Sequence, residues 1–129
     1  MELRNETDGL VRKPPVPNGP TVTVVFGGEE GGPDVGLVKV LVPAGAGMPA
    51  HRHNGSDVIL TPVAGFVQIT GGEQSIEVHV GDSALVRKDE KVSLTNPGHE
   101  DAHVVVVAGP ANFVAGVRQW PAPDAASIG

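Results

Sequence analysis

Three side chains within a short stretch of this sequence could together hold a divalent metal ion. His51 and His53 are separated by one residue, and Asp57 follows them after the turn-forming segment 54–56. On a β-strand, residues two positions apart project to the same side, so the two imidazoles could reach a single point. The turn would fold the chain back and bring the Asp57 carboxylate toward that point. Two imidazoles and one carboxylate form the facial triad that binds iron, manganese or a related divalent ion and leaves coordination positions open.

These residues also allow interpretations without a metal. The two histidines could lie near the mouth of a barrel and form hydrogen bonds with the backbone or with water. Asp57 could bond to backbone groups of the turn that precedes it, as aspartates in turns commonly do. We therefore predict His51 and His53 as the stronger metal ligands, and Asp57 as a third ligand or a catalytic general base.

The histidine pair lies within a motif that resembles the first motif of the cupin family. That family motif runs glycine, five residues, His-x-His, three or four residues, glutamate, about six residues and glycine. Gly45, the two histidines and Gly65 stand in this order, and Asp57 takes the acidic position when three residues are counted. Counting four residues places Val58 there instead, without a carboxylate. Seven residues separate Asp57 from Gly65, which predicts a bulge near Pro62.

A second stretch resembles the second cupin motif in a degenerate form. It begins at Gly81 and ends at Asn96, but Arg87 and Asp89 occupy its usual proline and glycine positions. The family's third metal-binding histidine falls on Val92, which has no donor atom. The resemblance to both motifs covers residues 38–107, and the lost histidine is its main departure from the family pattern.

The resemblance implies a small single-domain cupin with an all-β jelly-roll fold, a double-stranded β-helix barrel. It implies that His51 and His53 bind a divalent ion (iron, manganese, nickel or zinc) and that Asp57 supplies the acid. His103, at the start of a later strand, could replace the lost imidazole, but we expect it to face solvent. We expect His79 and His99 to lie outside the site and Arg52 to point away from it.

Two functions of different classes are compatible with these residues. In the first, a metal held by the histidine pair acts as a Lewis acid or oxygen-activating centre on a small organic molecule, with dioxygenase- or isomerase-like chemistry. In the second, the barrel has lost its metal and binds a small ligand without catalysis, for example in sensing. The intact histidine pair favours the first function, and Val92 favours the second. The sequence assigns neither the substrate nor the reaction.

The elements that must position these side chains are short strands. Eighteen glycines and twelve prolines are dispersed along the 129 residues, and the runs between them are rich in Val, Ile and Thr, as is typical of strands. The expected strands are residues 21–26, 37–42, 57–61, 63–70, 75–80, 83–87, 91–96, 103–108 and 113–120. Phe113 and Trp120 would lie on the last of these as packing residues. We expect an extended arm (1–20), a cupin barrel (21–120) and a flexible tail (121–129).

The composition limits the partners of the protein. A formal net charge of −6 without a cluster of Lys or Arg argues against nucleic acid and anionic membranes. The sequence contains no cysteine, which excludes disulfides and thiolate chemistry. Residues 1–6 do not resemble a signal peptide, so we expect a cytoplasmic protein. A barrel lined mainly by Val, Leu and Ile suits a small, partly apolar ligand. We also expect a homodimer, paired through an outer strand or the N-terminal arm.

Overall fold

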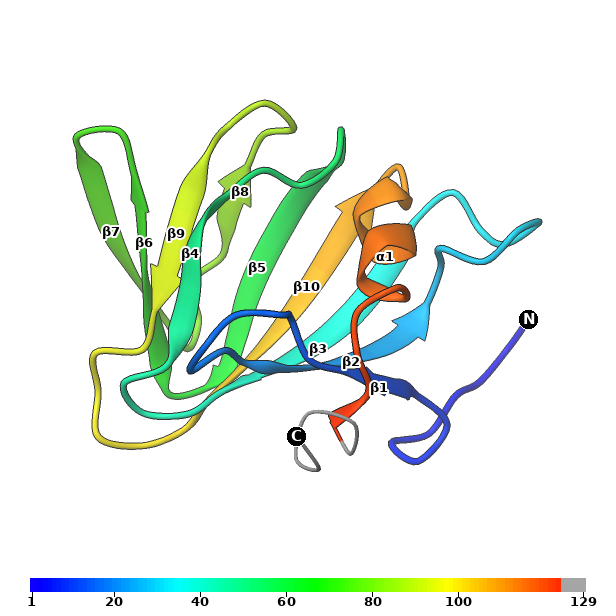
Figure 1. Cartoon of the computed structure of the whole chain (residues 1–129), viewed down its shortest axis with the longest axis horizontal. Helices are drawn as coiled ribbons and strands as arrows, with labels where there is room; N and C mark the ends of the chain where they lie inside the picture. The colour runs from blue at the N-terminus through cyan, green and yellow to red at the C-terminus, as the bar shows by residue number, and fades with distance from the viewer. Residues whose placement is uncertain (124–129) are drawn as a thin grey trace.

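Two antiparallel β-sheets face each other, and one short helix packs beside them (Figure 1). The computed structural model describes residues 1–123. The larger sheet has the strand order β1-β2-β3-β10-β5-β8, and the smaller sheet has the order β4-β9-β6-β7. In chain order the elements are β1 (Leu10–Arg12), β2 (Thr21–Phe26), β3 (Gly36–Val42), β4 (Gly47–His51), β5 (Asp57–Ala64), β6 (Phe66–Gly71), β7 (Gln74–His79), β8 (Ala84–Val86), β9 (Val92–Thr95), β10 (Ala102–Gly109) and α1 (Asn112–Val117).

The hydrophobic core lies between the two sheets, and the strands reach it with alternate side chains. In β10, residues 102, 104, 106 and 108 are buried, whereas His103 and Val107 are exposed. In β5, Val58 and Leu60 are buried, whereas Ile59 is exposed. Such alternation is what the two-residue period of a strand produces when one face of a sheet is covered. It places the inward side chains of β5 and β10, which are neighbours in the larger sheet, on the same wall of the barrel.

The predicted all-β jelly-roll fold is confirmed, and so is the predicted bulge near Pro62. The pairing of β10 with β5 matches Val104 with Pro62 but His103 with Ala64. Val63 is therefore the extra residue, and it is exposed on the outer face of the sheet. A bulge of this kind changes the direction of a strand without breaking the sheet.

The predicted last strand, residues 113–120, is wrong, because most of this segment forms helix α1. Val114 and Val117 are fully buried and lie one helical turn apart, so they face the core together. Phe113, Val117 and Trp120 also have the spacing of a helical stripe. The valines and aromatic residues suit a strand by composition, but burial of one helical face outweighs this weak preference.

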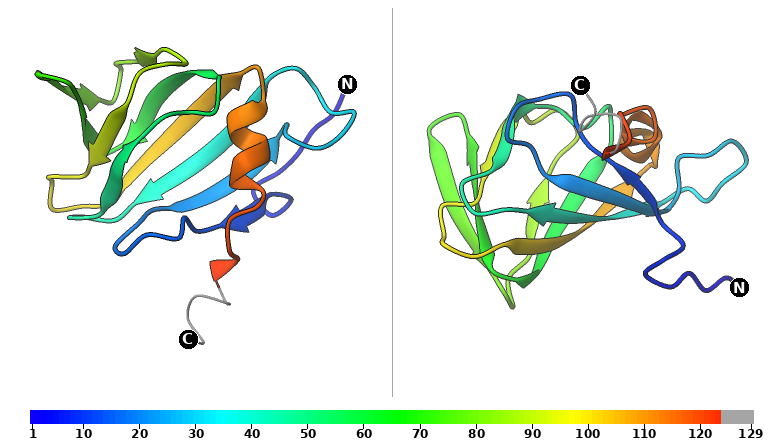
Figure 2. Two further views of the ribbon diagram at one scale, coloured as in Figure 1. Left: turned by 45° about the horizontal axis from the view of Figure 1, so that its top comes forward. Right: turned by 60° about the horizontal axis from the view of Figure 1, so that its bottom comes forward.

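The two ends of the described chain meet at the edge of the larger sheet. Within the predicted arm, β1 pairs with β2 and covers its edge. The backbone N–H of Lys13 donates to the carbonyl of Pro121 at 2.8 Å, and Arg12 Nε donates to the carbonyl of Arg118 at 3.2 Å. Figure 2 shows β1 at this edge, with the segment after α1 running close to it. The part of the predicted tail after residue 123 lies outside the described residues.

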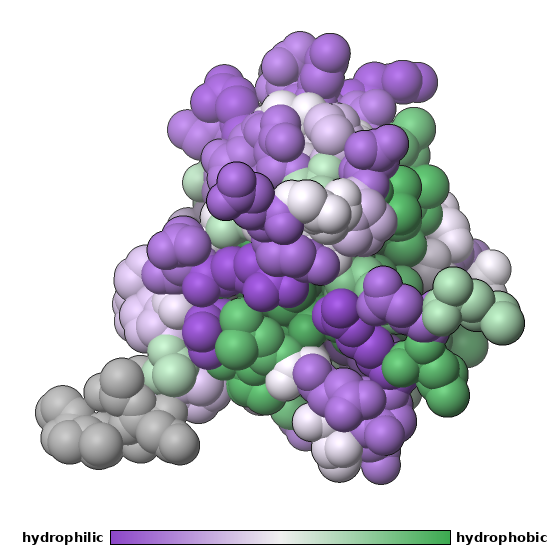
Figure 3. Space-filling model, turned by 90° about the vertical axis from the view of Figure 1, so that its right-hand side faces the viewer, coloured by the Kyte–Doolittle hydropathy of each residue, from purple (hydrophilic) through white to green (hydrophobic). Residues whose placement is uncertain are grey.

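The surface next to the N-terminus is mainly hydrophilic, with smaller apolar areas between the polar side chains (Figure 3). Within residues 1–123, no helix has the length and apolar character needed to cross a membrane.

Candidate functional site

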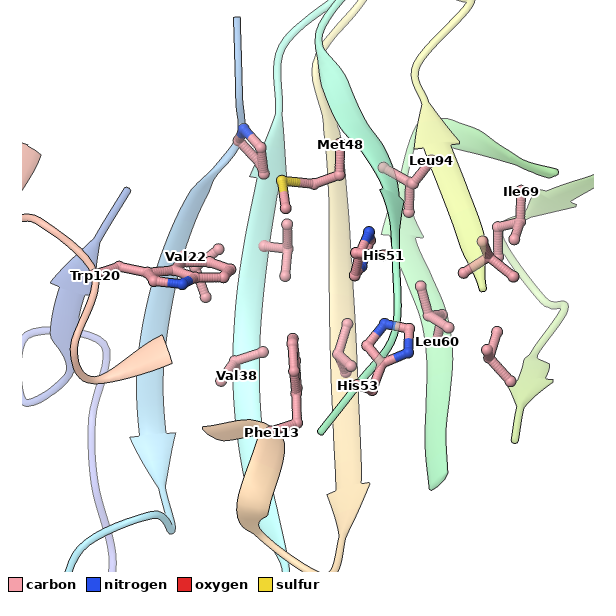
Figure 4. A pocket seen from close by; sticks show the side chains of 15 residues that line it. Val22, Val38, Met48, His51, His53, Leu60, Ile69, Leu94, Phe113 and Trp120 are labelled. Atoms are coloured by element: carbon pink, nitrogen blue, oxygen red, sulfur yellow. The ribbon is translucent and has the colours of Figure 1, made fainter. Parts of the chain in front are cut away.

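A cavity of about 60 Å³ lies between the two sheets, and His51 and His53 project into it (Figure 4). Aliphatic side chains from both sheets form most of its wall, together with Met48, Phe113 and Trp120. Apart from the indole of Trp120, the two imidazoles are the only polar side chains that line the cavity within the described chain. Any polar recognition inside this space therefore depends on the histidine pair.

His51 is the last residue of β4 and holds its ring by a hydrogen bond to its own strand. The ring Nδ1 lies 2.8 Å from the carbonyl oxygen of Pro49. A carbonyl can only accept, so Nδ1 carries the proton and Nε2 of the neutral ring carries the free lone pair. Metal-binding histidines commonly donate their second ring nitrogen to a backbone carbonyl in this way, which fixes both tautomer and orientation.

His53 follows the end of β4 and is 5% exposed. Its ring centroid lies 4.7 Å from that of His51, with the two planes at 71°, and 4.9 Å from that of Phe113. Its buried Nδ1 has no hydrogen-bond partner among the described residues. Burial, and to a smaller extent the charge of His51, lowers the pKa of His53 from 6.5 to about 4. The ring is therefore neutral at pH 7, which is the form that binds metals.

Two family ligand positions are occupied by valine. Val92 of β9 pairs directly with His51 and lines the cavity, so the position of the third histidine is next to the pair. Val58 of β5 is fully buried, faces the core in phase with Leu60, and is separated from His53 by four residues. The spacing with four residues between His53 and the acidic position therefore agrees with the fold. It places Val58 at that position and leaves the family's usual six residues before Gly65.

The structure does not bring Asp57 to the histidine pair. Asp57 is exposed, on the side of β5 opposite to the buried Val58, and its Oδ1 accepts a hydrogen bond from the backbone N–H of Lys88 at 2.9 Å. Within residues 1–123, no group of three or more His, Cys, Asp or Glu side chains is arranged to hold a metal. The described site therefore consists of two imidazoles, and the prediction of Asp57 as a third ligand or general base is not supported. Its carboxylate bonds to the loop after β8, and not to the preceding turn as in the alternative interpretation.

The remaining histidines lie outside the cavity, as expected. His103 is exposed on the outer side of β10 and does not replace the third imidazole. His79 is exposed, stacks on Phe66, and its Nε2–H donates a hydrogen bond to the carboxylate of Glu77 at 3.1 Å. His99 is exposed as well. None of these three rings can contribute to a site at the histidine pair.

Phe113 and Trp120 are the cavity residues whose place the sequence did not indicate. The sequence predicted them as packing residues of a strand, but they reach the cavity from α1 and from the segment after it (Figure 4). Ser56 holds the start of this helix, because its hydroxyl donates to the carbonyl of Pro110 and accepts from the N–H of Phe113. The spacing of positions 113, 117 and 120 is the one sequence signal that would have revealed the helix.

The family comparison identifies the fold independently of this geometry. The cupin domain family matches residues 38–108, more than half of the chain. The chain belongs to the cupin family. No curated protein matches the sequence.

Solved structures with the same fold have low sequence identity to this chain. KdgF from Halomonas sp. is 18% identical, with a TM-score of 0.70, over 85% of this chain and 94% of that chain. Oxalate oxidase in complex with the substrate analogue glycolate is 23% identical, with a TM-score of 0.66, and the match covers 76% of this chain and 54% of that chain. The Fe(II) form of HppE is 13% identical, with a TM-score of 0.71, over 84% of this chain and 60% of that chain. This chain thus spans little more than half of the latter two proteins, and the likeness is one of fold.

Proposed function

We propose that His51 and His53 bind a divalent metal ion and that the protein uses this ion on a small organic molecule inside the barrel. The observation that supports this most directly is the buried Nδ1 of His53, which has no hydrogen-bond partner in the described chain. Leaving such a nitrogen without a partner costs about 1–3 kcal/mol. A bound cation beside the ring would offset this cost.

The donor set suits an ion that accepts imidazole ligands. His51 already uses Nδ1 for the Pro49 carbonyl, which leaves Nε2 for a metal. His53 is neutral at pH 7 because of its lowered pKa. Iron, manganese, nickel and zinc all bind neutral imidazole, and two protein ligands leave further positions for water and substrate. When bound, such an ion supplies Lewis-acid or oxygen-activating chemistry, and we propose dioxygenase- or isomerase-like reactions.

The chain itself contributes the environment of the reaction. The aliphatic walls offer water no hydrogen-bonding partners away from the histidine pair, and Met48 and Phe113 would hold an apolar part of the substrate beside the imidazoles. Exclusion of water strengthens the electrostatic interactions of the site. Two of the proteins with the same fold support the proposed chemistry by their names: HppE is described in an Fe(II) form, and oxalate oxidase is an oxidase.

Val92 and Val58 favour a second candidate function, a metal-free barrel that binds a small ligand without catalysis. Both residues stand where the family places metal ligands, and neither has a donor atom. Both are buried against the core, so they extend its apolar surface. In this alternative the imidazoles would serve as hydrogen-bonding groups for the ligand.

Metal content separates the two candidates. We would purify the protein without an affinity tag or chelator, soak it in Fe(II), Mn(II), Ni(II) or Zn(II), and quantify bound metal by mass spectrometry. The proposal expects close to one ion per chain in the wild type and none in His51→Ala/His53→Ala. The matched control His99→Ala/His103→Ala, which removes two exposed histidines, should keep the ion. Only trace metal in the wild type after soaking would reject the first candidate and favour the second.

The expected homodimer and cytoplasmic location stay predictions. Size-exclusion chromatography with light scattering would measure the molar mass in solution and so test the homodimer directly.

A further inference from the structure

A second hollow adjoins the cavity beside His51 and carries a charge that the cavity lacks. Four residues line both spaces: Met48, His51, Phe113 and Trp120. The hollow adds two polar side chains, Arg52 and Asn54, from the segment that follows β4. Because these four residues line both spaces, we infer that the hollow is the mouth of the cavity, and we use this name for it below. Arg52 lines the mouth and not the cavity, so a molecule that fills both spaces would lie against Arg52.

Arg52 is available to bind an anion. It is exposed, and none of the ion pairs among residues 1–123 involves it. Its described hydrogen bond is a long one, from Nε to the carbonyl of Asp89 at 3.4 Å. The terminal nitrogens of the guanidinium therefore keep their donors, which have the fork geometry that matches a carboxylate.

The inner cavity complements the mouth by its lack of fixed charge. Among residues 1–123, no lysine, arginine, aspartate or glutamate lines it. Its volume of about 60 Å³ is small beside the several hundred Å³ typical of drug-sized ligands. The cavity therefore suits a short apolar group, and a charged group on the same molecule is better placed at the mouth.

We infer that Arg52 determines the specificity of this site and that the ligand is a small carboxylate with a short apolar body. The apolar body lies in the cavity next to the histidine pair, and the carboxylate meets the guanidinium of Arg52 at the mouth. The inference rests on the proposed function for the position of the ligand, but it does not require a bound metal. The net charge of −6 does not prevent such binding, since charges more than about 8 Å away are largely screened at physiological salt.

Paired acids and amides test this inference. Isobutyrate, isovalerate and benzoate would each be compared with the neutral primary amide of the same shape, in protein freed of metal by a chelator. Removing metal matters because an ion could itself bind the carboxylate. Titration calorimetry and the fluorescence of Trp120, the one tryptophan of the chain, would report binding. In the wild type at least one acid should bind about five- to tenfold more tightly than its amide.

Substitution of the arginine should remove this preference. Arg52→Gln should bring the affinities of acid and amide together. Arg87→Gln, which neutralises an exposed arginine that lines neither space, should keep the wild-type preference. Equal binding of acid and amide by the wild type, an unchanged preference in Arg52→Gln, or no binding of any probe at millimolar concentration would each overturn the inference.

Metal content, measured separately, keeps this test independent of the proposed function. Equal binding of acid and amide by wild-type protein that takes up one ion in the metal assay would reject only the role of Arg52. An intact preference in protein that binds no metal would reject only the metal.

Discussion

His51 and His53 differ sharply in their surroundings although a single residue separates them. His51 is half-buried, and its proton on Nδ1 has a carbonyl partner. His53 is almost fully buried, contacts the ring of Phe113 and has no partner for Nδ1 within the described chain. A positive charge on His53 would therefore be poorly solvated, and this ring must stay neutral for the fold to keep its full stability.

The lowered pKa of His53 predicts that the metal-free protein loses stability in mild acid. Between pH 6.5 and about 4, His53 binds a proton in the unfolded chain but not in the folded protein, so acid favours unfolding. The free energy of unfolding should be highest above pH 6.5 and fall by up to roughly 3 kcal/mol toward pH 4. Urea titrations across this range, on chelator-treated protein, measure the loss.

Two variants show whether His53 causes this loss. His53→Leu lacks the titrating ring, so its stability should fall much less between the same pH values. His103→Gln removes an exposed histidine and should keep the wild-type slope. An equal slope in the wild type and His53→Leu would assign the acid sensitivity to other groups.

The position of Val92 beside His51 predicts that one substitution can restore a third imidazole to the site. Val92 pairs with His51 and lines the cavity, so Val92→His would place a donor beside the pair. Metal affinity should rise by more than about tenfold, since even outer partners of metal ligands change affinity about 10- to 100-fold. Competition with a metal indicator measures this, and Val107→His on the outer face of β10 is the control. The same affinity in Val92→His and the wild type would show that the position does not face a metal.

At the level of the elements, the assignment of the acidic position depended on a register that the sequence left open. A shift of one residue moves a side chain from one face of a strand to the other. Strand β5 has apolar residues on both faces, Leu60 inside and Ile59 and Val63 outside. Hydrophobic alternation alone therefore could not decide between Asp57 and Val58. The pairing with β10 decides it, because this pairing sets which residues face the core.

Most strands were predictable, but β1, β4 and the walls of the cavity were not, and the expected strand 63–70 ran across the turn between β5 and β6. Strand β10 alternates buried and exposed residues between turn signals, and it was predicted nearly to its ends. Helix α1 was missed, since a six-residue helix rich in valine has little intrinsic preference for its conformation. Its stability comes from burial of Val114 and Val117 against the sheets, a contact that local sequence does not reveal. Because the helix was not predicted, the position of Phe113 in the cavity was not predicted either.

The hydrogen bonds of Ser56 predict that the start of α1, and with it the stability of the protein, depends on this one side chain. Its fully buried hydroxyl bonds to the carbonyl of Pro110 and to the N–H of Phe113. Ser56→Ala would leave both backbone groups without this partner and should destabilise the protein by about 1–3 kcal/mol. Chemical denaturation measures this change. Ser75→Ala, at an exposed serine of β7, should cost less than about 0.5 kcal/mol, and similar losses in both variants would show that α1 is held by other contacts.

At the scale of the whole molecule, the cavity depends on contacts between the two ends of the described chain. The segment after α1 carries Trp120 to the cavity wall, and its position is fixed from the N-terminal side. Arg12 donates to the carbonyl of Arg118, and Lys13 donates to that of Pro121. Arg118 in turn donates to the carbonyl of Gly27 and pairs with Glu29 at 2.9 Å. Residues about 90 to 108 positions apart in the sequence thus hold one side of the site.

Deleting residues 1–13 should therefore disturb the site as well as the sheet. The deletion removes β1, the packing of Leu10 on the core and both hydrogen bonds to the segment that carries Trp120, which should destabilise the protein by about 1–2 kcal/mol or more. Trp120 is half-buried, so loss of its support should shift its fluorescence emission to longer wavelength while the fold persists, as far-ultraviolet circular dichroism can verify. Deletion of residues 1–3, which precede these contacts, is the control and should leave the emission unchanged. An unshifted emission in the longer deletion would mean that α1 alone fixes Trp120, and that the N-terminal strand stabilises the sheet without shaping the cavity.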